Sequence, residues 1–109
     1  MHLVAFDPTV GAETKKTRPA LIVQNDIDNR YSPVTIALPI TSRFDSTLYP
    51  TEVLVRPPDG GLRLESVVLA NQIRCIDKAR LIQRLGTLRP QTMAQVDRAL
   101  QISLGLIEL

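Results

Sequence analysis

Short apolar runs separated by turn residues are the feature that most limits what this chain can fold into. The runs are four to seven residues long and rich in Val, Ile and Leu, which is typical of β-strands. The predicted strands are residues 3–6, 19–23, 34–40, 52–55, 66–69 and 73–76, with residues 81–85 as one more candidate. Residues 25–32 and 41–50 are predicted as polar loops between them.

Only the tail of the sequence has a helical pattern. No Gly occurs between Pro90 and Leu104, and Met93, Val96, Leu100 and Leu104 recur at spacings of three and four residues. This is the apolar stripe of an amphipathic helix, and Pro is tolerated in its first turn. We therefore predict a mainly β fold, a strongly curved antiparallel sheet or small barrel, with the C-terminal helix covering one side.

Chain length and composition bound the domain count and the core. A chain of 109 residues supports one hydrophobic core, so we predict a single domain over residues 1–109. Aromatic residues make up 4% of the chain and Trp is absent, so the core must be aliphatic. The net charge of +2 is too small to indicate a polyanionic partner by itself. Such a partner has to be argued from clustered charges.

Cysteine and histidine usage excludes two kinds of stabilising site. Cys75 is the only cysteine and His2 the only histidine, so the chain has no internal disulfide and no zinc site of Cys and His side chains. The N-terminal residues lack the pattern of a signal peptide, and no apolar run approaches the roughly 20 residues of a transmembrane helix. We expect a reduced, cytoplasmic protein with no membrane segment.

The connection between the first two predicted strands is long and charged. It lies in the segment FDPTVGAETKKTRPALIV, residues 6–23, which contains two Lys, an Arg, two acids and several turn residues. Long loops in compact domains are often functional. Two interpretations follow, a solvated loop without a role or a loop that binds an anion.

Further blocks follow this segment in the sequence. In order they are LPITS, YPTEVLV, GLRLESVVLANQIRCIDKARL and RLGTLRPQTMAQVDRAL. Together these blocks resemble the MazF/PemK toxins of bacterial toxin–antitoxin pairs, over nearly the whole chain. The resemblance implies an SH3-like barrel, a homodimer, and a toxin that cleaves single-stranded RNA (mRNA) at specific sequences without metal or cofactor. It also implies 2′,3′-cyclic phosphate and 5′-hydroxyl products, and a small acidic antitoxin that blocks the RNA groove.

Metal-independent cleavage of RNA needs a base for the 2′-hydroxyl, stabilisation of the phosphorane and a proton donor. The resemblance points to Arg18, Thr41 and Glu13 as the catalytic residues. Arg18, in the K-x-R-P block, is the expected phosphorane stabiliser, because a guanidinium donates two parallel hydrogen bonds to a phosphate and stays charged. Its alternative is a surface arginine at a strand edge.

Thr41 and Glu13 each have a second interpretation. The Thr41 hydroxyl can bind a phosphate oxygen or position the 2′-hydroxyl, or it can satisfy backbone amides in a turn at the strand end. Glu13 can act as the base, or it can pair with Lys15 or Lys16 in an exposed loop. The expected RNA-binding residues are Lys15, Lys16, Thr17, Ser42, Asn71, Gln72 and Arg74.

Asn71 departs from the pattern of the family that the chain resembles. Many relatives carry an acid at this position, and in some that acid is assigned a catalytic role. An amide cannot accept a proton at neutral pH. The enzyme is therefore slow or inactive if this acid is required, whereas Asn71 only hydrogen-bonds RNA or a neighbouring strand if Glu13 or Arg18 handles the proton.

Two alternatives to an active ribonuclease follow from the same resemblance. The fold is similar to that of CcdB-type toxins, which bind DNA gyrase and cleave nothing. An inactive relative that only binds its antitoxin is the second alternative. Substitution of Arg18 separates a nuclease from a gyrase binder, because it should abolish the toxicity of the nuclease only.

Overall fold

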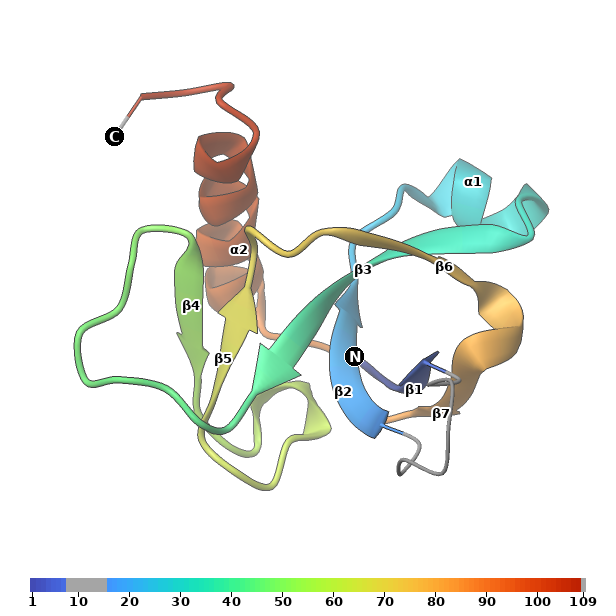
Figure 1. Cartoon of the computed structure of the whole chain (residues 1–109), viewed down its shortest axis with the longest axis horizontal. Helices are drawn as coiled ribbons and strands as arrows, with labels where there is room; N and C mark the ends of the chain where they lie inside the picture. The colour runs from blue at the N-terminus through green and yellow to red at the C-terminus, as the bar shows by residue number, and fades with distance from the viewer. Residues whose placement is uncertain (8–15, 109) are drawn as a thin grey trace.

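The computed structural model describes residues 1–7 and 16–108, which form a mainly β structure (Figure 1). The strands are β1 (His2–Asp7), β2 (Lys16–Ile22), β3 (Val34–Thr41), β4 (Glu52–Val55), β5 (Ser66–Leu69), β6 (Arg74–Asp77) and β7 (Leu81–Arg84). The helices are α1 (Asp26–Tyr31) and α2 (Pro90–Ser103), with short 3-10 helices η1 (Asp59–Gly61) and η2 (Lys78–Arg80). Each predicted strand is thus present, with bounds that differ by a few residues at most.

One strand, β3, connects the two parts of the sheet. The strand order is β4-β5-β3-β2-β1-β7, and β6 also pairs with β3. The beginning of β3 (Val34–Ala37) pairs with β6, and its end, Ile40 and Thr41, pairs with β5, so both partners share one edge of β3. All of these pairs are antiparallel. The strongly curved antiparallel sheet is confirmed, and no pairing that closes it into a barrel is detected in the described part of the chain.

The C-terminal helix covers one part of the sheet, as predicted. Figure 1 shows α2 beside β4 and β5, while β1, β7 and α1 lie in the other part of the molecule. Val96 and Ala99 of α2 are buried, and Met93 and Leu100 pack beside them. Leu104, which the apolar stripe included, is 59% exposed and lies just after the helix ends. Within residues 1–7 and 16–108, neither helix is long and apolar enough to cross a membrane.

Two aliphatic clusters form the core. The larger one joins α2 to the sheet and includes Leu38, Val53, Val55, Val68, Val96 and Ala99. The smaller one lies under β1 and β2 and includes Val4, Phe6, Ala20, Ala37 and Ile76. Each fully buried Val or Leu contributes about 1.5–3 kcal/mol relative to an exposed side chain. The expectation of an aliphatic core is confirmed, with Phe6 as its one aromatic member among the buried residues described.

The segment 25–32, predicted as a polar loop, contains the helix α1 instead. Asn25 caps its N-terminus, because its side-chain oxygen accepts the backbone N–H of Asp28 at 2.9 Å. No residue of α1 is buried. The helix therefore lacks the apolar stripe from which a helix is recognised in a sequence, and its signal in the sequence is the local cap at Asn25.

The loop between β4 and β5 is fastened to the N-terminus of α2. Asp59, which is 6% exposed, accepts the backbone N–H of Arg89 at 2.8 Å and the hydroxyl of Thr92 at 2.5 Å. Burial alone would raise the pKa of Asp59, but the hydrogen bonds from Thr92 and Arg89 outweigh it and lower the pKa below its usual 3.8. A carboxylate at a helix N-terminus is also favoured by the helix dipole. Asp59 thus caps α2 from a distant part of the chain.

Two glycines let this loop pack closely against the end of β7. Gly61 has a φ of +77°, and a Cβ there would lie 2.0 Å from the carbonyl oxygen of Leu85. A Cβ on Gly86 would lie 2.8 Å from the carbonyl carbon of Gly60. Only glycine fits these positions, so the backbone of residues 59–62 lies directly on that of residues 85–86.

Candidate active site

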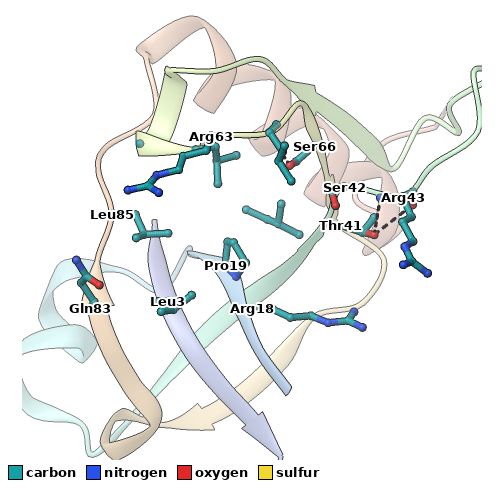
Figure 2. Close-up of a pocket in the computed structure, with 14 residues that line it drawn as sticks. Leu3, Arg18, Pro19, Thr41, Ser42, Arg43, Arg63, Ser66, Gln83 and Leu85 are labelled. Atoms are coloured by element: carbon teal, nitrogen blue, oxygen red, sulfur yellow. Dashed lines mark hydrogen bonds between the residues drawn. The ribbon is translucent and has the colours of Figure 1, made fainter. Parts of the chain in front are cut away.

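A cleft of about 750 Å³ opens between the ends of several strands (Figure 2). Residues of β1, β2 and β3 line one part of it. The loop after β3, the β4–β5 loop, the start of β5 and the end of β7 with the residue after it line the rest. The lining residues of β1 and β2 include Leu3, Arg18 and Pro19, and Thr41, Ser42 and Arg43 follow one another at the end of β3. Three of the predicted site residues, Arg18, Thr41 and Ser42, therefore meet in one cavity.

Arg18 is held by the β1–β2 ladder, in which it is paired with Val4. Pro19 follows it in the cleft wall, and the next residue, Ala20, is fully buried. Figure 2 shows the Arg18 side chain extending to the end of the cleft where Thr41 and Arg43 lie. Its guanidinium has no hydrogen bond or ion pair within the part of the chain that the structure describes. A guanidinium that is held on a strand and has no partner among the described residues is suited to bind a phosphate.

Thr41 and Ser42 differ in what their hydroxyls contact. The Thr41 hydroxyl donates to the carbonyl oxygen of Arg43 at 3.1 Å and accepts the backbone N–H of Arg43 at 3.1 Å. It therefore closes a turn at the strand end, one of the two interpretations made from the sequence. The exposed Ser42 hydroxyl has no partner among the residues described here. Ser42 is the hydroxyl that is immediately available to a ligand, whereas Thr41 shapes the loop that carries Ser42 and Arg43.

Arg43 and Arg63 line the cleft but were not identified from the sequence. Arg43 lies in the predicted polar loop 41–50, and Arg63 lies in the turn-rich segment after Pro58. Each is a single arginine in a polar context, so nothing in the local sequence separated it from the other exposed arginines. Their common location depends on the tertiary fold, which brings the loop after β3 and the β4–β5 loop to the same cavity.

The charge of the cleft exceeds that of the whole protein. Three arginines line it, and no carboxylate side chain does so among the residues described. Since the whole chain has a net charge of +2, these three charges leave the rest of the protein at −1. Clustered charge of this kind attracts anions although the overall balance does not.

Three predicted RNA-binding residues lie away from this cleft. Asn71 and Gln72 are exposed in the turn between β5 and β6, where the Gln72 N–H donates to Leu69 at 3.1 Å. Arg74, on β6, has its guanidinium 5.0 Å from the centre of the Phe6 ring. The structure therefore places Arg74 beside β1 and β3, and none of the three residues lines the cleft with Arg18.

The remaining predicted residues belong to the connection between β1 and β2. Glu13 and Lys15 lie outside the described residues, so their roles stay predictions. Lys16 is the first residue of β2 and is paired with Asp7. Thr17 is exposed and is paired with Ala5. Both follow the undescribed segment directly, two residues or fewer from Arg18 along the strand.

Comparison with known proteins gives a consistent result over almost the full length. Residues 1–104 match the family of PemK-like, MazF-like toxins of type II toxin-antitoxin systems. The chain is 42% identical over 108 residues to the endoribonuclease EndoA of Bacillus subtilis (strain 168), an alignment that covers 99% of this chain and 93% of EndoA.

Solved structures agree with this assignment. An endoribonuclease from a mycobacterial species, in complex with its cognate antitoxin, has a TM-score of 0.78 at 30% identity and covers 99% of this chain and 95% of that one. The MazE–MazF complex (Form-II) of Deinococcus radiodurans has a TM-score of 0.79 at 31% identity, covering 97% and 94%. The chain therefore belongs to the PemK-like, MazF-like toxin family of type II toxin–antitoxin systems.

Proposed function

We propose that this MazF-like toxin endoribonuclease cuts single-stranded RNA in the cleft that contains Arg18, without a metal ion. The observation that carries the proposal is the convergence of Arg18, Thr41 and Ser42 in one cationic cavity. The identity of 42% to the endoribonuclease EndoA over 108 residues supports it independently. No carboxylate lines the cavity in the described part of the chain, and carboxylates are the usual protein ligands of Mg²⁺.

The reaction that fits these groups is an internal transesterification. The ribose 2′-oxygen forms a bond to phosphorus, its proton passes to a base, and the bond from phosphorus to the 5′-oxygen breaks as that oxygen takes up a proton. The products are a 2′,3′-cyclic phosphate and a 5′-hydroxyl. Arg18 donates hydrogen bonds to the phosphate oxygens on which charge accumulates, and removing one such donor typically lowers kcat by about 10²–10³. Glu13 remains our proposed base.

The location of Asn71 supports the inference that proton transfer does not depend on this residue. It lies in the exposed β5–β6 turn and does not line the cleft. A carboxamide there does not remove a base from the immediate surroundings of Arg18. We therefore infer that Asn71, with Gln72 and Arg74, contacts RNA outside the catalytic cleft and that the enzyme is active.

The cleft also suggests how an antitoxin acts. The mycobacterial and Deinococcus relatives were solved in complexes with a cognate antitoxin or with MazE. We infer that an acidic antitoxin segment of this system binds the same cationic cleft and excludes RNA from it.

A homodimer is part of the proposal, with the exposed Leu104 and Leu106 after α2 as a candidate apolar contact. A toxin that cuts mRNA acts in the cytoplasm.

A long single-stranded RNA incubated with the purified protein in EDTA tests the function. We expect discrete cuts with cyclic-phosphate ends, which also reveal the recognised sequence. Arg18→Ala should lower cleavage by at least about 10². The matched control is Arg56→Ala, because Arg56 is exposed and pairs with Glu65 at 3.4 Å outside the cleft.

Two results would contradict the proposal. Absence of cleavage by a folded protein that binds its antitoxin would indicate an inactive relative, and Asn71→Asp would then be the next variant. Toxicity that persists in Arg18→Ala, together with inhibition of DNA gyrase, would indicate a CcdB-like binder.

A further inference from the structure

We propose that Arg63 is a second phosphate-binding residue, which holds the RNA backbone at the end of the cleft away from Arg18. This inference rests on the proposed function and adds a residue that sets how the RNA lies in the cleft. Its basis is the position of Arg63, the rigidity of the loop that carries it, and the absence of any partner for its charge among the described residues.

Arg63 and Arg18 approach the cavity from different sides. Figure 2 shows Arg18, Thr41 and Arg43 at one end, whereas Arg63 lies at the other end with Gln83 and Leu85. A cavity of about 750 Å³ is within the range of roughly 300–1,000 Å³ of small-molecule sites, so it holds more than one phosphate group. A strand that reaches both ends therefore presents one linkage to Arg18 and another to Arg63.

The loop that carries Arg63 is unusually well supported. Asp59 ties it to the N-terminus of α2 through Arg89 and Thr92, four residues before Arg63. Gly61 packs directly on the backbone of Leu85, and Leu62 is buried. The backbone is thus fixed up to the residue that precedes Arg63, so the arginine is presented from a rigid wall and loses less freedom on binding.

The two arginines of this loop differ in their partners. Arg56 forms an ion pair with Glu65 at 3.4 Å, whereas Arg63 has no hydrogen bond or ion pair within residues 1–7 and 16–108. No aromatic side chain lines the cleft in this part of the chain. Because recognition of an unstacked base commonly uses an aromatic platform, a phosphate is the group that Arg63 is best suited to bind.

RNA binding measured without cleavage provides the test. The probe is a fluorescent single-stranded RNA that contains the mapped cleavage sequence, with 2′-O-methyl groups that block attack by the 2′-oxygen. We expect Arg63→Ala to raise Kd about tenfold at low salt, as expected for the loss of one charged hydrogen bond. The slope of log Kd against log salt should fall by about 0.7, one phosphate contact on a single strand. Arg63→Lys should keep the slope, and Arg56→Ala should match wild type.

Neutral linkages then identify the phosphate. Methylphosphonates are placed one at a time along the probe, and one position away from the scissile linkage should weaken wild type but not Arg63→Ala. The proposal is overturned if no such position exists, or if Arg63→Ala changes the preferred RNA sequence and not the salt slope. It is also overturned if Arg63→Ala changes the oligomeric state of the protein, measured as its molecular mass in solution. A wild-type protein that binds this probe but cuts none of the same RNA with free 2′-hydroxyls contradicts the proposed function and still decides the role of Arg63. A wild-type protein that binds no RNA overturns both.

Discussion

The cap that Asp59 provides to α2 allows a quantitative prediction about stability. Asp59→Ala removes two short hydrogen bonds, at 2.8 Å to the Arg89 N–H and at 2.5 Å to the Thr92 hydroxyl. Hydrogen bonds to a charged group contribute about 1.5–3 kcal/mol each. The third contact, from Arg89 Nε at 3.4 Å, adds little because the Arg89 side chain is 68% exposed.

We expect Asp59→Ala to lower the free energy of unfolding by about 3–5 kcal/mol. Part of this cost comes from the Thr92 hydroxyl, which is 5% exposed and loses its partner. Adding Thr92→Val to Asp59→Ala removes that unsatisfied hydroxyl and should recover about 1–2 kcal/mol. Thr92→Val alone should be destabilising, because the buried Asp59 carboxylate loses the hydrogen bond from the Thr92 hydroxyl.

Urea unfolding of the four proteins, followed by circular dichroism, measures these differences. The midpoint should shift at an unchanged m-value, since the surface exposed on unfolding is the same. The reasoning is refuted if Asp59→Ala costs less than about 1 kcal/mol, or if Thr92→Val destabilises the Asp59→Ala variant further.

Three more predictions concern pH and the hydroxyls of the cleft. Burial, with repulsion from the N-terminus and Arg84, lowers the pKa of His2 below its usual 6.5. The free energy of unfolding should therefore decline as the pH falls below 6.5, because the unfolded chain binds the proton more readily. His2→Asn should remove this decline. The pKa of Asp59 is also lowered, so its stabilisation is complete above its usual 3.8 and is lost as pH falls toward the folded pKa; Asp59→Asn should flatten that part of the profile in unfolding measured across acid pH. Thr41→Val should reduce kcat and perturb the loop, whereas Ser42→Ala should reduce kcat by about 10-fold or more without changing stability. Equal stability losses in both variants would contradict the distinction between the two hydroxyls.

The strands and α2 were predictable because their signals are local. Apolar alternation, turn residues and the stripe of α2 are each contained in a short window of sequence. The helix α1 escaped because none of its residues is buried, so no stripe exists. The sequence predicted that the sheet is strongly curved but not which strands pair. The pairing of β5 and β6 with one edge of β3 depends on contacts between distant strands.

The residues of the candidate site could likewise be predicted only in part. Arg18, Thr41 and Ser42 were identified from the blocks that resemble the family, and the fold brings them together. Arg43 and Arg63 were missed because their position in the cleft depends on which loops converge, and no local pattern in the sequence indicates that. The turn made by the Thr41 hydroxyl was foreseen as an alternative, and the separation of Asn71, Gln72 and Arg74 from the cleft was not.

The arrangement of β3 has a consequence for which parts of the proposed site can tolerate substitution. β3 is the one strand with three partners in the described part of the chain, and Thr41 is its last residue, while Arg18 is held in the neighbouring ladder. The proposed catalytic residues are thus held by the most constrained part of the sheet. Arg43 and Arg63 lie on the loops beside it, where substitution leaves the ladders intact. Under the proposed function, substitutions in these loops can therefore change how tightly RNA is held, while the proposed catalytic residues keep their positions.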